Sequence, residues 1–149
     1  WEDPPASQEP FDNRFYWGRK TDGSLIERSL TDVNEVDEDG KALLDPITGK
    51  QVVTLGLKSI WVAQTKQTAQ NKLNRHDWMI TRKSEKGTAI PSDVTTYRDA
   101  VRTKCASIET AINNCSNLTQ FIALFEAPVD SDDKPTGDPA PINDFPDEI

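Results

Sequence analysis

Proline residues at both ends of the chain set the strongest limit on its fold. Residues 1–12 (WEDPPASQEPFD) carry three prolines and four acids, and residues 127–149 carry five prolines. Proline fixes the backbone φ angle and lacks an N–H donor, so neither segment can form a helix or a central strand. We therefore predict an extended N-terminal arm over residues 1–12, a compact domain over residues 13–126 and an extended acidic C-terminal arm over residues 127–149.

The composition of the two arms indicates that they need a surface to lie on. Segments this polar bury too little apolar area to hold a fixed shape alone. We therefore expect both arms to lie on neighbouring subunits, with their few large apolar side chains as anchors. Trp1 is favoured because indole rings are frequent interface anchors. The predicted anchors in partner grooves are Trp1, Phe11, Ile142 and Phe145.

Charge alternates along the chain. Residues 126–149 hold eight acids against one lysine, a net charge of −7, and residues 27–45 hold seven acids against two bases, a net of −5. Residues 50–125 hold eleven bases against five acids, a net of +6. This pattern favours segments that dock on each other or on neighbouring copies. Arg98 and Arg102, one turn apart on the predicted exposed flank of a helix, are candidate receivers of an acidic arm; alternatively, both are solvated.

Residues 14–55 are predicted to form a small antiparallel β region. The aromatic stretch RFYWG at 14–18 favours a short strand, and ALL with QVVTL favours a hairpin further on. Turn sequences separate these stretches: TDGS at 21–24, EDGK at 38–41 and DPITGK at 45–50.

Helices are predicted after Gly56. Apolar residues recur at multiples of four through residues 58–74, and a narrow apolar seam begins after Ser92, the predicted N-cap. Thr119 is predicted to cap a short second helix that folds back on the seam helix as a helical hairpin. Residues 78–83 alternate as in a short strand, so the fold class is predicted to be α+β. The seam consists of Val94, Tyr97, Val101, Cys105, Ile108 and Ile112.

The residues that could support catalysis or metal binding are few. His76 is the only histidine, and the following Asp77 points away from it because neighbouring side chains diverge. Cys105 and Cys115 lie ten residues apart, about 15 Å along a helix, which is too far for a disulfide, so we predict small buried thiols. We predict no enzyme activity, no cofactor and no metal. A small enzyme or metal protein built around His76 is the alternative.

The same features limit the partners. A net charge of −8 argues against nucleic acid as a general partner, and no apolar run is long enough to span a membrane. No secretion signal is expected. We therefore predict no nucleic acid, no membrane and no small-molecule substrate, and expect other proteins as partners.

One long stretch resembles a known family. Residues 57–102 resemble a segment of tailed-bacteriophage tail-fibre assembly proteins and related tail proteins, in which an Asp–Trp step, an Arg-containing strand and an xIPxxVxxYRxxxR helix start follow one another. TDVNEVDEDG and QVVTLGLKS are similar to virion proteins of contractile-tailed cyanophages, and INDFP is similar to the aromatic–Pro ending of this group. The matching residues here are Asp77, Trp78, Arg82, Lys83, Ile90, Pro91, Val94, Tyr97, Arg98 and Arg102.

The resemblance implies a structural component of a bacteriophage virion, in the tail, tail fibre or baseplate. Its expected partners are other virion proteins and copies of itself, and its expected location is the virion. Two related alternatives stay open: a tail-fibre assembly chaperone absent from the mature particle, and a head decoration protein.

Overall fold

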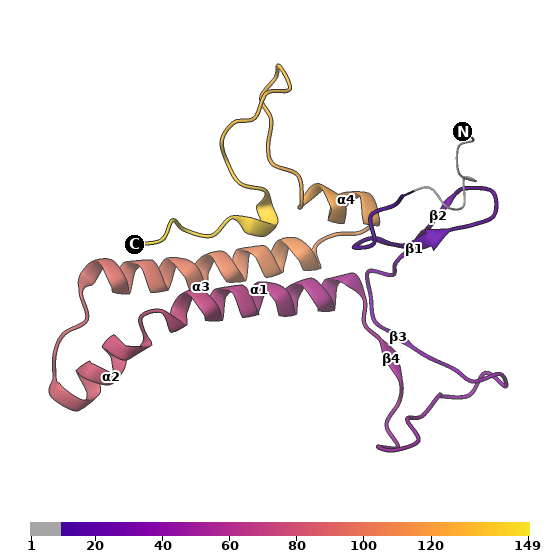
Figure 1. The fold of residues 1–149 in the computed structure, drawn as a ribbon, viewed down its shortest axis with the longest axis horizontal. Helices are drawn as coiled ribbons and strands as arrows, with labels where there is room; N and C mark the ends of the chain where they lie inside the picture. Colours follow the sequence, from indigo (N-terminus) through magenta and orange to yellow (C-terminus); the bar gives the residue numbers. More distant parts are fainter. Residues whose placement is uncertain (1–9) are drawn as a thin grey trace, which may run out of the picture. The chain divides into compact units, whose positions relative to one another are not determined.

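The computed structural model describes residues 10–149 and divides the chain into two compact units, Trp1–Ile60 and Trp61–Ile149 (Figure 1). Two small antiparallel sheets lie in the first unit, and helices dominate the second. The predicted α+β fold class is therefore confirmed. The predicted boundaries at residues 12 and 126 are a different division of the chain and stay a prediction.

The first unit contains two strand pairs. β1 (Tyr16–Arg19) pairs with β2 (Leu25–Glu27), with an irregular register next to Gly18, and β3 (Val33–Asn34) pairs with β4 (Val53–Thr54). In the turn between β1 and β2, the Asp22 carboxylate accepts hydrogen bonds from the Ser24 amide and hydroxyl. The antiparallel β region predicted over 14–55 is confirmed.

The loop that precedes β3 accepts hydrogen bonds from the backbone amides at the start of helix α1 (Leu57–Asn74). The first amides of a helix have no partner within the helix. Here the Gly56 amide donates to the Asp32 carboxylate at 2.8 Å, and the amides of Leu57 and Lys58 donate to the carbonyls of Ser29 and Leu30. The hydrogen bond from the Gly56 amide lowers the pKa of Asp32, and a further bond from the Ser59 side chain acts in the same direction.

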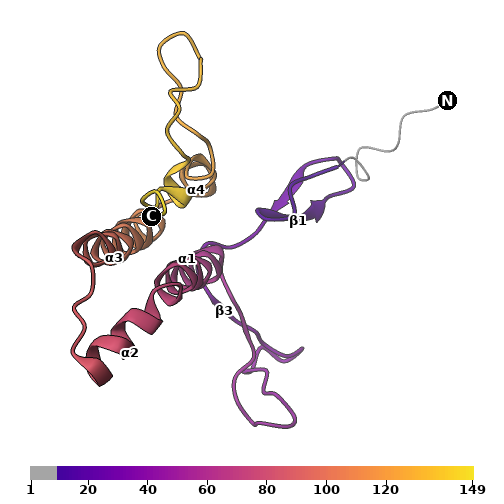
Figure 2. The ribbon, with the colours of Figure 1, turned by 60° about the vertical axis from the view of Figure 1, so that its left-hand side comes forward.

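The core of the second unit lies between α1 and α3 (Ser92–Asn113), which run antiparallel and side by side in both views (Figures 1 and 2). Ala69 of α1 packs with Tyr97 and Val101 of α3, and Leu73 and Cys105 pack against this cluster. The predicted seam of α3 is confirmed, with Cys105 half-buried and its other five members buried. The sequence predicted both helices but not their pairing.

Helix α4 (Leu118–Ala123) follows α3 after a short connection and buries Leu118 and Phe121. Both predicted caps are wrong by one or two positions. Ser92 is the first residue of α3, after Pro91, and makes no capping bond. At α4 the cap is Asn117, whose side chain accepts from the Gln120 amide at 2.8 Å, in place of Thr119.

The strand predicted over residues 78–83 is wrong, because these residues belong to helix α2 (Asp77–Lys86). Among the residues that the structure describes, α2 is a helix without a buried side chain, so its alternating apolar residues do not mark a core face. Gly87 ends α2 with a left-handed φ of 71°, and its amide donates to the Lys83 carbonyl.

Candidate interaction surfaces

The end of the C-terminal arm lies on the second unit itself. Ile142, in the short 3-10 helix η2 (Pro141–Asn143), is only 6% exposed, and its amide donates to the Leu124 carbonyl at 3.0 Å. Phe145 packs against the cluster of Ala69, Tyr97 and Val101. Both predicted anchors are therefore used within the chain, because the α1–α3 core supplies the apolar surface that was expected from a partner. A partner contact by either residue stays a prediction.

Ion pairs fix the same segment, residues 140–148, which we call the C-terminal clasp. Lys104 pairs with Asp144 at 2.8 Å, and Glu148 pairs with Lys72 at 3.3 Å and with Arg75. The Lys72 ammonium also lies 5.6 Å from the centre of the Phe145 ring. The acidic end thus docks on basic side chains of its own unit, which is one of the two arrangements that the charge pattern favours.

The clasp is expected to open in acid. Hydrogen bonds from Arg75 and Lys72 hold the pKa of Glu148 below its ordinary value of 4.5. Because the pKa of Glu148 is lowered in the folded chain, these bonds stabilise the clasp fully at pH values above 4.5. They are lost as the pH falls through the lowered pKa. Hydrogen exchange of the amides of residues 142–149, taken relative to the intrinsic rate at each pH, should therefore accelerate in acid. Glu148→Gln should accelerate it at neutral pH, while Asp147→Asn should not; unchanged exchange in Glu148→Gln would contradict this role.

The two arginines proposed as receivers of an acidic arm have different surroundings. Arg98 is buried, and its Nη1 bonds to the Leu73 carbonyl at the end of α1 and pairs with Asp77 at 3.3 Å. The expected exposure of Arg98 is therefore wrong, because its guanidinium ties the end of α1 to the start of α2. Arg102 is exposed and pairs with Asp99 at 3.2 Å. Contact of either with a partner stays a prediction.

His76 and Asp77 do not face each other as a catalytic pair. The imidazole ring lies edge-on to Tyr97, with 5.7 Å between ring centres, while the Asp77 carboxylate pairs with Arg98. Among residues 10–149 no group of three histidine, cysteine or acidic side chains is placed to hold a metal ion. That the protein is not an enzyme stays a prediction.

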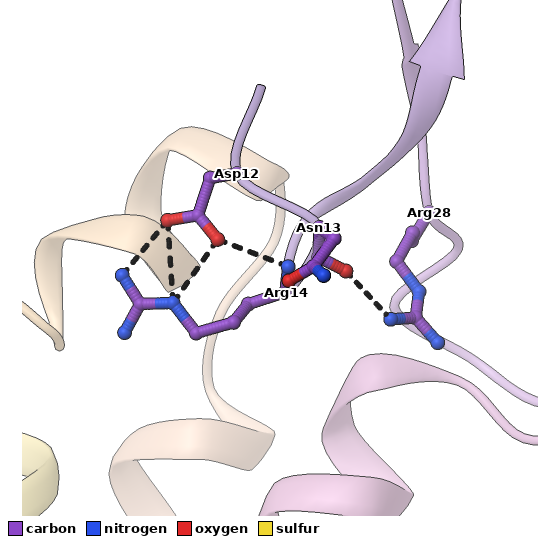
Figure 3. Close-up of polar contacts among 4 residues, drawn as sticks. All are labelled: Asp12, Asn13, Arg14 and Arg28. Atoms are coloured by element: carbon purple, nitrogen blue, oxygen red, sulfur yellow. Dashed lines mark hydrogen bonds and ion pairs between the residues drawn. The ribbon is translucent and has the colours of Figure 1, made fainter. Parts of the chain in front are cut away.

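The described end of the N-terminal arm is held by its own unit. The Asp12 carboxylate bonds to the Arg14 guanidinium, and Arg28 donates to the Asn13 carbonyl at 3.0 Å (Figure 3). The bonds from Arg14 lower the pKa of Asp12. Phe11 is 39% exposed, so this predicted anchor is available to a partner. Trp1 lies outside the described residues.

The largest group of exposed apolar side chains lies in residues 32–55, which we call the β arm. It holds seven of the fourteen large apolar side chains that are exposed in the described part of the chain. Ile47, in the second turn of the β arm, is 92% exposed. The seven are Val33, Val36, Leu43, Leu44, Ile47, Val53 and Leu55.

Hydrogen bonds, not a core, hold the β arm together. The Glu35 amide donates to the Val52 carbonyl, the Leu43 amide to the Glu35 carbonyl and the Val52 amide to the Leu43 carbonyl. The Gln51 side-chain amide lies 2.7, 3.1 and 3.0 Å from the carbonyl oxygens of Glu35, Leu43 and Val52. Three stretches of chain therefore meet at Gln51, and most of their large apolar side chains remain exposed.

Each turn of the β arm is shaped by an aspartate. The Asp37 carboxylate accepts from the amides of Asp39 and Lys41, and the Asp45 carboxylate accepts from the amides of Ile47 and Thr48. The bonds at Asp45 lower its pKa. These turns present Ile47 and the acids Glu38 and Asp39 at the ends of the β arm.

Helix α2 presents a second exposed apolar surface. Trp78 is 56% exposed and Ile80 is exposed as well, while the Arg82 guanidinium lies 4.9 Å from the centre of the Trp78 ring. The helix carries three cations, Arg82, Lys83 and Lys86, against the acids Asp77 and Glu85.

Neither surface was predicted as a contact site from the sequence. Apolar residues of a hairpin or strand usually lie in a core. A signal was present in the β arm, where Leu43, Leu44 and Ile47 sit beside turn residues and many acids. Such a composition leaves little for these side chains to pack against.

No protein-family model, curated protein or solved structure matches this chain. Within residues 10–149, the structure contains no helix with the length and apolar character needed to cross a membrane. The resemblance of residues 57–102 to phage tail proteins stays a prediction.

Proposed function

We propose that this protein is a structural component of a bacteriophage virion, in the tail, tail fibre or baseplate, and that its β arm binds a neighbouring subunit. The phage placement is supported by the sequence resemblance of residues 57–102. The binding role is supported by one observation above all: seven large apolar side chains are exposed on a single hydrogen-bonded segment of 24 residues.

Exposure of this kind favours a binding surface. Large apolar side chains gathered on the surface of one segment mark a candidate site of interaction or aggregation. In the β arm, the aspartate-shaped turns and the Gln51 bonds set the backbone without help from these side chains. They are therefore available to a partner, and a shaped arm loses less conformational entropy on binding than an unstructured one.

Mass spectrometry of purified particles tests the proposed function. The chain should co-purify with virions of the phage that encodes it, in constant proportion to the other tail proteins. An assembly chaperone would instead be abundant in the infected-cell lysate and absent from the particles. That second result would overturn the structural role in the particle.

A further inference from the structure

We infer that the β arm of one copy binds helix α2 of a second copy, so that copies of the protein associate head to tail. The inference rests on the proposed role of the β arm as a subunit-binding element. The inference adds that helix α2 of a second copy is the surface that receives the β arm.

Both surfaces have apolar side chains to bury. The β arm offers Ile47 and Leu44, and α2 offers Trp78 and Ile80. Burial of apolar area contributes about 25 cal/mol per Å², and tryptophan is among the residues that most often dominate an interface. Among the described helices, α2 is set apart because it has no buried side chain of its own.

Charge complementarity selects α2 as the receiver. The β arm carries six acids against Lys41 and Lys50, a net charge of −4. On α2, Asp77 is already paired with Arg98, so Arg82, Lys83 and Lys86 face only Glu85 as an acid of the same helix. Opposite charges around an apolar contact steer association and fix its register.

The contact would join two different surfaces. An association of that kind is heterologous, and it produces closed rings or open filaments, whereas a contact between identical surfaces produces twofold dimers. Every copy has both surfaces, so each can bind two neighbours.

Reversal of charge on each surface separately tests the inference. Glu38→Lys with Asp39→Lys changes the β arm but spares Asp37 and Asp45, which shape its turns. Lys83→Glu with Lys86→Glu changes α2. The wild-type chain of 149 residues should associate in sedimentation velocity at high micromolar concentration. Each double variant alone should bind itself at least about tenfold more weakly, because like charges then face each other across the contact.

An equimolar mixture of the two double variants should associate again. The reversed β arm of one then meets the reversed α2 of the other, while the remaining two surfaces keep their natural charges. The control is Glu126→Lys with Asp132→Lys, which replaces two acids by lysine as the β-arm variant does, on exposed residues outside both surfaces. It should leave association unchanged.

Three results would overturn the inference: a monomeric wild-type chain, double variants that associate like the wild type, or a mixture that does not regain association. None of these results bears on whether the chain is found in virions. A failure of this inference is therefore distinguishable from a failure of the proposed function.

Discussion

Phe121→Ala is expected to lower the free energy of unfolding of the second unit by about 3–5 kcal/mol. The Phe121 side chain is fully buried, at 0% exposed, in the short helix α4. Its ring lies 5.4 Å from that of Phe125, which in turn lies edge-on to Trp61 at 4.7 Å. Truncation removes the apolar contacts and leaves a cavity that α4, only six residues long, can close only in part.

Urea-dependent hydrogen exchange of peptides from residues 92–123 measures this effect unit by unit. The matched control is Phe11→Ala, which removes the same side chain from an exposed position. It should cost less than about 1 kcal/mol. Equal losses in the two variants would contradict the complete burial of Phe121.

Gly56→Ala is expected to destabilise the first unit by about 3 kcal/mol, because there is no room for a methyl group at this position. A Cβ atom on Gly56 would overlap the backbone carbonyl groups of Leu30 and Thr31. Backbone atoms cannot move aside as a flexible side chain can. The same loop accepts the hydrogen bonds of the first amides of α1, so a displaced loop would also leave those donors unsatisfied.

Hydrogen exchange of the amides of Leu57 and Lys58 reports on this change, since both donate to the loop. Gly18→Ala is the control, because a Cβ atom there meets nothing within 4 Å. Faster exchange in the Gly56 variant alone is the expected outcome. Native-like exchange at Leu57 in Gly56→Ala would show that the loop does not lie this close.

The sequence predicted those elements that carry a clear local signal. The seam of α3 was evident because its spacings of 3 and 4 match a helix face, and that face is buried against α1. The β region was evident from its turns, and Asp22, Asp37 and Asp45 do shape those turns through bonds to backbone amides. Local chemistry was sufficient in both cases.

Helix α2 was predicted as a strand because its residues alternate in character. Such periodicity identifies a helix or a strand only where one face of that element is buried. Trp78, Ile80 and Arg82 alternate, but none of them is buried, so their spacing carries no information on the fold. Better signals were present at the ends. Asp77 lies in the first turn, Lys83 and Lys86 lie in the last turn, and Gly87 follows with a left-handed conformation.

Sequence patterns did not predict contacts between residues that are distant in sequence. Ile142 and Phe145 could pack on the chain's own core or on a partner. Which of the two occurs depends on where α1 and α3 leave an apolar surface uncovered. Burial of Arg98 depends in the same way on the position of the Leu73 carbonyl. The meeting of three stretches of the β arm at Gln51 is likewise a contact between residues distant in sequence, which no local pattern encodes.

The most direct test of the central claim, that the β arm binds a second copy of the chain, is sedimentation equilibrium of the 149-residue chain against a variant with Val36, Leu44 and Ile47 all replaced by serine. The wild type should associate, and the variant should be monomeric with an unchanged melting temperature, because these side chains are exposed within the chain. A control with serine at Ile26, Val129 and Ile149, which are exposed outside the β arm, should still associate. Association of the serine variant at wild-type strength, or a monomeric wild type, would contradict the claim.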